Sequence, residues 1–153
     1  EQKIMISYRN ANSSNLKELL EMHKLMDNEE ISMGCNWDNH MDEKHLKEIL
    51  QDKKTISVLA LDKKKVIGFG YGREENNVFL LHNIFVLKEY RKQGIASEIF
   101  RKIMKKMKND IVEAYILKGN AYAVEFWLKR GFEKTKELKN AFQLRYFLSE
   151  RTI

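Results

Sequence analysis

Residues 91–96, with the sequence RKQGIA, form a basic turn whose composition suits an anion-binding site. The turn follows an apolar run at 78–87 and precedes an amphipathic segment, so we expect a strand that leads through a glycine turn into a helix. The first backbone N–H groups of a helix have no partner within the helix and point outward together. Gly94 would let the backbone approach a ligand, while Arg91 and Lys92 add positive charge where the helix dipole already favours an anion. The residues alone leave both a phosphate site and an ordinary strand-to-helix turn open.

The elements on either side of this turn can be inferred from their periodicity. The run at 78–87 is rich in branched and aromatic residues, which is typical of a strand buried on both faces. His82 and Asn83 interrupt it, and two polar residues inside a buried strand need a reason. After the turn, apolar residues at helical spacing predict one buried helix face: Ile95, Ala96, Ile99, Phe100, Ile103, Met104 and Met107.

The composition is that of one globular domain spanning residues 1–153. Its 153 residues can bury a core, and 43% of them are hydrophobic and 33% charged. No apolar stretch approaches the ~20 residues that a membrane span needs, and the N-terminus has no signal-peptide pattern, so we expect a cytoplasmic protein without a membrane partner. The single cysteine, Cys35, cannot form an intramolecular disulfide, which fits a reducing compartment.

The formal net charge of +6 suits an anionic partner. Nucleic acid is one candidate, but the lysines are spread over separate segments and no recognised nucleic-acid-binding motif is present. We therefore do not expect nucleic acid as a partner. Histidine, cysteine and carboxylate residues show no cluster at metal-ligand spacing, so no metal is expected either.

Two segments together resemble the GNAT superfamily of acyl-CoA-dependent N-acetyltransferases. Residues 91–96 match the family signature Arg/Gln-x-x-Gly-x-Gly/Ala, and they lie where the family carries it, between a long strand and a long helix. Residues 120–132, NAYAVEFWLKRGF, are similar to the family's downstream pattern Asn-x-x-Ala-x-x-Phe-Tyr-x-x-x-Gly-Phe. Each motif is weak alone, but their order and spacing make the pair specific.

The remaining patterns extend the resemblance to nearly the whole chain. They predict the order β-α-α-β-β-β-α-β-α-β-β, which implies a single α/β domain with a mixed, mostly antiparallel central sheet flanked by helices, as in the GNAT fold. The segment 28–41 has no clear period, and its Trp37 could plug the core or form a wall of a substrate pocket. Gly68, Gly70 and Gly72 alternate in one strand, so either something approaches closely there or the strand is bulged. The expected strands are 5–8, 55–61, 65–73, 78–87, 111–117, 132–138 and 141–148, and the expected helices begin at Asn15, Asp42, Ile95 and Asn120.

The resemblance implies acetyl-CoA as the cosubstrate and indicates where it would lie. In the family, the pantetheine arm lies beside the long strand as if it were another strand, and backbone groups there bind its amides and thioester carbonyl. The pyrophosphate would bind mainly to main-chain N–H groups of the turn. Asn120 would reach the pantetheine arm, although its side chain could instead cap the helix that it begins. The cofactor-binding residues implied in this way are Ile84, Phe85, Val86, Arg91, Lys92, Gln93, Gly94, Ile95, Ala96, Ser97, Asn120 and Trp127.

The resemblance also bears on the catalytic base. An acceptor amine is mostly protonated at neutral pH, and a histidine, which titrates near pH ~6.5, can remove its proton directly or through water. Many family members have a glutamate near the position of His82, and the serotonin acetyltransferases have a histidine there. His82 is therefore a candidate base, with a structural histidine as the alternative, and Asn83 could orient it or line the pocket.

The catalytic acid departs from the family pattern. Many relatives have a tyrosine that protonates the leaving thiolate, but this chain has Trp127, whose indole N–H is a donor and not a useful acid. The thiolate could leave with the help of water, because a thiol of pKa ~8.5 is a tolerable leaving group. Another tyrosine, such as Tyr122, Tyr71 or Tyr146, could take its place, or the chain could bind CoA without turnover.

The resemblance therefore implies an N-acetyltransferase that moves an acetyl group from acetyl-CoA to a primary amine of a small molecule or protein, by direct attack in a ternary complex. A catalytically silent module that binds or senses acyl-CoA is the alternative. The positive net charge argues against a strongly cationic acceptor, unless carboxylates of the early segment gather over the pocket. Family members often dimerise, so a homodimer is also considered. The carboxylates concerned are Glu29, Glu30, Asp38, Asp42 and Glu43.

Overall fold

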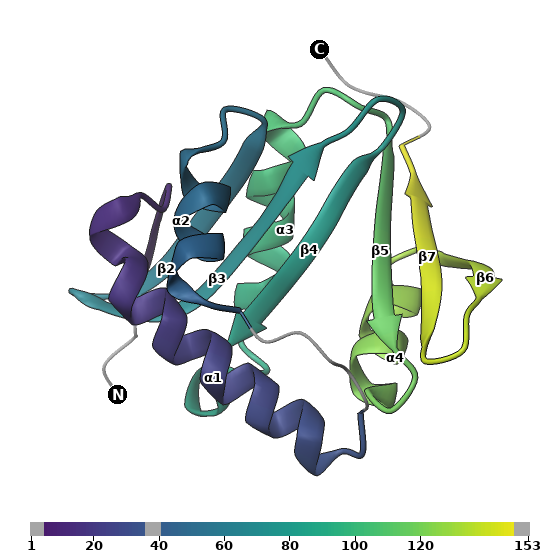
Figure 1. Ribbon diagram of the computed structural model, residues 1–153, viewed down its shortest axis with the longest axis horizontal. Helices are drawn as coiled ribbons and strands as arrows, with labels where there is room; N and C mark the ends of the chain where they lie inside the picture. Colours follow the sequence, from purple (N-terminus) through teal and green to yellow (C-terminus); the bar gives the residue numbers. More distant parts are fainter. Residues whose placement is uncertain (1–4, 36–40, 149–153) are drawn as a thin grey trace.

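The computed structural model describes residues 5–35 and 41–148, and its elements follow the predicted order (Figure 1). The described helices are not long and apolar enough to cross a membrane. The strands are β1 (Ile6–Arg9), β2 (Thr55–Asp62), β3 (Lys65–Glu74), β4 (Phe79–Val86), β5 (Ile111–Leu117), β6 (Glu133–Glu137) and β7 (Ala141–Phe147). The helices are α1 (Leu16–Ser32), α2 (Glu43–Gln51), α3 (Ile95–Lys106) and α4 (Ala121–Lys129), with short 3-10 segments at Ser13–Asn15 and Lys88–Tyr90. The predicted α/β class is confirmed.

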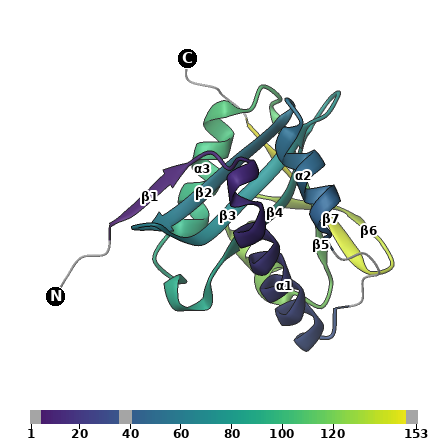
Figure 2. The ribbon, with the colours of Figure 1, turned by 60° about the vertical axis from the view of Figure 1, so that its left-hand side comes forward.

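The described strands form one sheet in the order β1-β2-β3-β4-β5-β7-β6. β4 and β5 are parallel neighbours, and the other neighbouring pairs are antiparallel. The sheet is therefore mixed and mostly antiparallel, as predicted. The parallel pair needs a crossover connection, which α3 supplies on one face of the sheet, while α1 and α2 lie on the other face (Figure 2).

Each face of the sheet has its own apolar core. On one face, α3 buries Ile99 and Ile103 against the strands, next to aromatic residues of α4 and the segment that follows it. On the other face, α1 buries Leu19 and Met22, and α2 buries Leu46. Helical spacing of apolar residues predicts these contacts, because residues three and four positions apart share one face of a helix.

The alternating glycines of β3 reflect both of the alternatives left open by the sequence. A Cβ atom at Gly70 would lie 2.5 Å from Cγ2 of Ile99, so a side chain there would collide with α3. A Cβ atom at Gly72 would lie 2.5 Å from the ring of Phe79. Gly68 instead lies beside an irregularity in the pairing of β2 with β3. Close approach therefore accounts for Gly70 and Gly72. At Gly68 the bulge and a close approach coincide, since a Cβ atom there would lie 3.2 Å from the Phe85 carbonyl oxygen.

Helix α1 continues into the segment 28–41, for which the sequence indicates no period. His23 and Asp27 interrupt the apolar stripe of this helix, although both are buried. The hydrophobic period fades at these polar residues while the helix goes on, so its length is underestimated from the sequence. Trp37 and Asp38 lie outside the described residues.

A β-bulge in β4 opens the sheet between β4 and β5. Tyr71 of β3 pairs with Asn83. The next residue of β3, Gly72, pairs with Leu81, so His82 is an extra residue on β4. β4 pairs with β5 over three residues that precede the bulge, and beyond it the two strands diverge (Figure 1). Past the bulge, the edge of β4 that faces β5 therefore has no partner among the described strands.

Candidate active site

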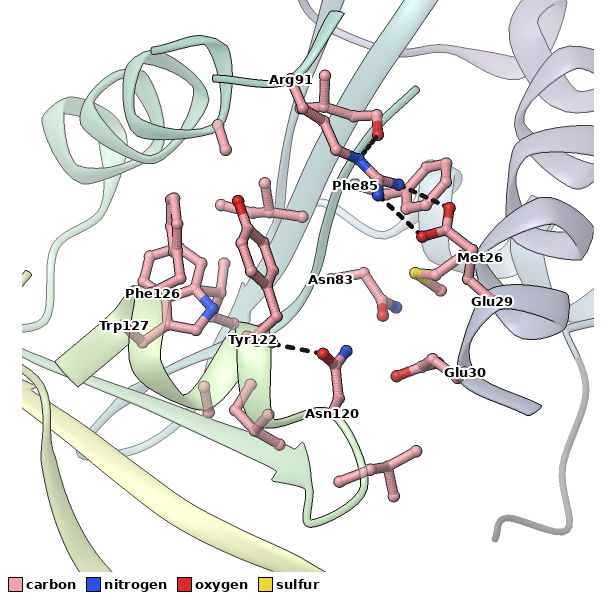
Figure 3. Close-up of a pocket in the computed structure, with 18 of the residues that line it drawn as sticks. Met26, Glu29, Glu30, Asn83, Phe85, Arg91, Asn120, Tyr122, Phe126 and Trp127 are labelled. Atoms are coloured by element: carbon pink, nitrogen blue, oxygen red, sulfur yellow. Dashed lines mark hydrogen bonds and ion pairs between the residues drawn. The ribbon is translucent and has the colours of Figure 1, made fainter. Parts of the chain in front are cut away.

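A cavity of about 520 Å³ lies where β4 and β5 diverge (Figure 3). Its walls come from β4 and β5, the turn that begins α3, α4 and the C-terminal half of α1. Gln93 does not belong to its lining. The other predicted site residues all line it: His82, Asn83, Ile84, Phe85, Val86, Arg91, Lys92, Gly94, Ile95, Ala96, Ser97, Asn120, Tyr122 and Trp127.

The turn before α3 has the geometry of a helix-start anion site. Gly94 is the N-cap of α3 with φ of 78°, a left-handed conformation that glycine adopts without strain. The first hydrogen bond of the helix runs from the Glu98 N–H to the Gly94 carbonyl, so the N–H groups of the three residues between them precede the helical ladder. The space around Gly94 is open, since a Cβ atom built there would meet nothing within 4 Å. N–H groups that precede the helical ladder, together with the open space at Gly94, suit a phosphate.

Arg130 adds a guanidinium to this end of the cavity that sequence reasoning missed. Its Nε donates to Oγ of Ser97 at 2.9 Å, and its Nη1 donates to the Phe126 carbonyl at 2.9 Å. The guanidinium carbon lies 3.3 Å from the centre of the Phe126 ring. Arg130 occupies an unspecified position of the downstream motif, so the motif gave no signal for it.

The stretch of β4 after the bulge offers its backbone edge to the cavity. Phe85 and Val86 are 8% and 6% exposed, and their side chains belong to the cores on opposite faces of the sheet. Ile84 packs against the core beneath α3. Because these side chains are committed to packing, the groups that remain along this edge are those of the main chain, which suits an extended ligand lying parallel to the strand.

The guanidinium of Arg91 points toward α1. Its Nη1 and Nη2 donate to the two carboxylate oxygens of Glu29 at 2.9 and 2.6 Å, and its Nε donates to the Val86 carbonyl at 2.8 Å. Figure 3 shows this fork above the ring of Phe85, 5.3 Å from the ring centre. The motif places Arg91 at the turn as expected, but its side chain joins the turn to a helix 62 positions away in sequence.

His82 lines the cavity from the bulge of β4. Its side chain is exposed to solvent, yet the protein atoms around it remove enough hydration to lower its pKa. The positive charges of Arg73 and His45 also lower this pKa, and Glu75 opposes them. Because an unperturbed histidine titrates near pH ~6.5, a lowered pKa means that His82 is neutral at neutral pH and can accept a proton.

A buried polar network that sequence reasoning missed holds Asn83. Nδ2 of Asn83 donates to the Tyr71 hydroxyl at 3.0 Å, and that hydroxyl lies 3.3 Å from Nε2 of His23. An amide nitrogen can only donate, so the hydroxyl accepts from Asn83, and it can give its own proton to Nε2 of His23 in the tautomer that leaves this nitrogen unprotonated. Burial lowers the pKa of His23 to about 4, in agreement with this arrangement. One feature of the sequence indicated this network, namely that His23 lies on the apolar face of the first helix.

Two consequences follow for the predicted catalytic groups. Since Asn83 uses its amide nitrogen on Tyr71, its carbonyl oxygen is left to face the cavity (Figure 3). Burial raises the pKa of Tyr71 to about 12, partly offset by the hydrogen bond from Asn83 and reinforced by Asp27. Tyr71 is therefore poorly suited to protonate a thiolate, because its proton is held far above neutral pH.

Asn120 serves both walls of the cavity through its side-chain amide. Its Oδ1 accepts from the Ala123 N–H at 3.1 Å, which is the helix-capping role foreseen as an alternative. Glu30 of α1 lies near this amide (Figure 3). Burial raises the pKa of Glu30, and the Asn120 amide acts in the opposite direction. The carboxylates of α1 thus face the cavity opposite the basic turn.

The two aromatic candidates of α4 lie in different surroundings. Trp127 is 6% exposed and packs edge-on against Phe126, with ring centres 4.8 Å apart, and against Phe100 at 5.1 Å. Tyr122 is 57% exposed and projects from α4 across the cavity (Figure 3). Tyr146, the third tyrosine considered, packs in the core against Phe132 and does not line the cavity. Of these tyrosines, Tyr122 is the one whose hydroxyl can reach a ligand in the cavity.

Comparisons with known proteins agree with this geometry. A family model described as an acetyltransferase (GNAT) domain matches residues 23–147. Within the described ranges, no group of three or more histidine, cysteine or carboxylate residues is placed to hold a metal ion. A comparison with curated protein sequences gave no match.

Solved structures of the same architecture extend over both chains almost completely. The PaiA N-acetyltransferase of Thermoplasma acidophilum, in complex with coenzyme A, has a TM-score of 0.83 at 18% identity, covering 94% of this chain and 99% of its own. A GNAT-family acetyltransferase of Staphylococcus aureus Mu50 has a TM-score of 0.78 at 20% identity, covering 95% and 100%. NAA60 of Arabidopsis thaliana, in complex with acetyl-CoA, has a TM-score of 0.74 at 15% identity, covering 95% and 100%. At these identities the structures establish the fold, and the family model assigns the chain: it belongs to the GNAT acetyltransferase family.

Proposed function

We propose that the protein moves an acetyl group from acetyl-CoA to a primary amine, by direct attack of the amine in a ternary complex. One observation carries the proposal: a single cavity contains both the edge of β4 that no described strand pairs with and the open helix start at Gly94. An extended amide-containing arm and a pyrophosphate need these two features side by side. The solved relatives named above with coenzyme A or acetyl-CoA support the same ligand.

The residues present fit this cosubstrate. The turn from Arg91 to Ser97 would hold the pyrophosphate, mainly through N–H groups at the start of α3, and the main chain of 84–86 would hold the pantetheine arm. An N–H group of β4 aimed at the thioester oxygen would stabilise the negative charge that develops there, because the fold fixes its direction before reaction. Lys92 and Arg130 add positive charge at the phosphate end of the cavity.

The acceptor amine must lose a proton before it can attack. His82 lines the cavity with a lowered pKa, so it is neutral at neutral pH and can take that proton directly or through water. The carbonyl oxygen of Asn83 can accept a hydrogen bond from the amine and orient it. The C–N bond then forms to give a tetrahedral intermediate, whose nitrogen loses its second proton to water. The C–S bond breaks as this intermediate collapses, and the departing thiolate takes a proton from water or from Tyr122.

A panel of primary amines tests this proposal. The protein is incubated with acetyl-CoA and, in turn, small amines, polyamines, amino acids and peptides with free N-termini, and the release of free CoA thiol is measured. We expect release that depends on both the protein and an amine. No release with any amine, while acetyl-CoA still binds, would contradict acetyl transfer.

A second candidate rests on Trp127. This residue occupies the motif position at which many relatives have a tyrosine, and it is buried among aromatic side chains. Its indole cannot serve as the acid. A module that binds acyl-CoA without turnover is therefore the alternative, and the amine panel separates the two candidates.

A further inference from the structure

Arg91 uses the fork of its guanidinium within the protein. Three of its five N–H donors are engaged, two by Glu29 of α1 and one by the Val86 carbonyl at the end of β4. The carboxylate faces the guanidinium with both oxygens, the geometry that gives the strongest ion pairs of this kind. The ring of Phe85 covers one face of the guanidinium. These contacts fix the side chain in one orientation, toward α1.

Glu29 lies where its ion pair with Arg91 can link two walls of the cavity. Glu29 lies near the C-terminal end of α1, on the wall of the cavity that faces the turn before α3. The adjacent residue, Glu30, lies near Asn120 at the start of α4 (Figure 3). Two consecutive residues of α1 therefore face the two sides of the opening between β4 and β5.

The end of α1 has little apolar packing to hold it. Its buried residues are Leu19, Met22, His23 and Asp27, while Ile31 is 53% exposed. The side chains of Arg91 and Glu29 are 27% and 34% exposed, so water screens them less than it does a fully exposed pair. The ion pair is thus a polar contact that ties the last turns of α1 to the end of β4 and the turn before α3.

We propose that Arg91 and Glu29 form a positioning pair that couples the acceptor wall, α1, to the phosphate-binding turn. This inference rests on the proposed function for the identity of the two ligands. Arg91 acts through α1 and the end of β4, while the phosphates bind to the N–H groups of the helix start. The pair places the carboxylates of α1 relative to the thioester, which lets cosubstrate binding order the acceptor wall.

The test compares the loss of Arg91 with the loss of Glu29. If Arg91 bound phosphate directly, the two losses would have different effects on acetyl-CoA binding. Arg91→Gln removes the guanidinium, Glu29→Gln removes the carboxylate, and the double variant removes both. Arg91→Lys keeps the charge but loses the planar fork. Arg101→Gln is the matched control, because Arg101 makes an equally close pair with Glu98 within α3 and so joins no two elements.

Two measurements are made on each variant. Hydrogen exchange of the backbone amides of residues 24–32 is followed in the free protein and with acetyl-CoA, and the acetyl-CoA dissociation constant is measured by calorimetry. We expect amide exchange to accelerate about tenfold in Arg91→Gln, Glu29→Gln and Arg91→Lys, and to be unchanged in Arg101→Gln. Acetyl-CoA should slow this exchange in the unmodified protein and not in the three variants.

Both single variants should lower the affinity for acetyl-CoA equally, by about three- to tenfold. The double variant should lower it no further than either single variant, because the two residues act as one unit. Weaker binding in Arg91→Gln with unchanged or tighter binding in Glu29→Gln would overturn the proposal, since that pattern identifies a guanidinium that binds phosphate. Unchanged exchange in 24–32 would also overturn it. If the unmodified protein binds no acetyl-CoA, the proposed function fails, while exchange in the free protein still decides whether the pair holds α1.

Discussion

The two walls of the cavity are built from different chemical groups. The wall formed by β4 after its bulge and by the start of α3 presents main chain, namely a strand edge that pairs with none of the described strands and a helix start at Gly94. The wall formed by α1 and the bulge of β4 presents side chains, among them Asn83 and Glu30, and the buried pair of Tyr71 and His23 supports Asn83. Main-chain groups keep their geometry when side chains change, so the first wall suits a ligand that is constant within a family. The second wall suits a ligand that varies.

This difference predicts where substitutions will act. Changes in the first wall should weaken binding of the cosubstrate, whereas changes in the second should alter turnover or the stability of the acceptor side while cosubstrate binding persists.

The largest effect is expected at His82. His82→Ala should lower kcat about 10²- to 10⁴-fold, because it removes the base, and should leave the acetyl-CoA dissociation constant nearly unchanged. In the unmodified protein, kcat/KM should fall with decreasing pH below 6.5, where His82 becomes protonated, since its pKa is lowered from 6.5. Lys47→Ala is the control, because Lys47 is exposed on α2 and lies outside the cavity lining. Equal turnover in the two variants would give His82 a structural role.

A smaller effect is expected from His23, whose titration should make the free energy of unfolding depend on pH. Its folded-state pKa is lowered from 6.5 to about 4, so between these values the unfolded chain binds a proton that the folded chain does not. Stability from this group is fully present above pH 6.5 and is lost as pH falls toward 4, by up to about 3 kcal/mol. Urea unfolding across this window should show the loss in the unmodified protein. His23→Gln, which cannot titrate there, should show a flatter profile, and identical profiles would contradict the buried neutral histidine.

The smallest effect on turnover is expected at Trp127. Trp127→Phe should cost about 1–2 kcal/mol of stability because it shrinks a buried ring, as urea unfolding would measure. Turnover at saturating substrates should stay within about threefold of the unmodified protein. A large loss of turnover with acetyl-CoA binding intact would show that the indole takes part in the reaction. A side chain of α4 would then belong to the catalytic groups as well.

The first wall was largely predictable from the sequence because its determinants are local. The apolar run, the glycine that tolerates a left-handed turn and the amphipathic helix follow one another within about thirty residues, and each is constrained by its own backbone. The family motif then identified the turn. Even so, the direction of the Arg91 side chain was not predictable, since it depends on Glu29, which lies 62 positions earlier.

The second wall was not predictable because it depends on contacts between distant segments. His23 and Tyr71 lie 48 positions apart and meet through the packing of α1 on the sheet. Burying polar residues in α1 also hid its true length, since the apolar period fades at Asp27. At His82, the sequence showed a polar break in a buried strand. The bulge and the divergence of β4 from β5 can be recognised only from the pairing registers of three strands.

The most direct test of the proposed acetyl-CoA site is a calorimetric titration of acetyl-CoA into the unmodified protein, Gly94→Glu and Gly34→Glu. Both glycines have left-handed backbone with open space around the position of a Cβ atom, so both substitutions impose similar strain, but Gly34 lies outside the cavity lining. A carboxylate at Gly94 would repel the pyrophosphate. We predict saturable binding to the unmodified protein and to Gly34→Glu, with a loss of affinity of about a hundredfold or more in Gly94→Glu. Equal binding by the two variants, or no binding by the unmodified protein, would contradict a phosphate site at the start of α3.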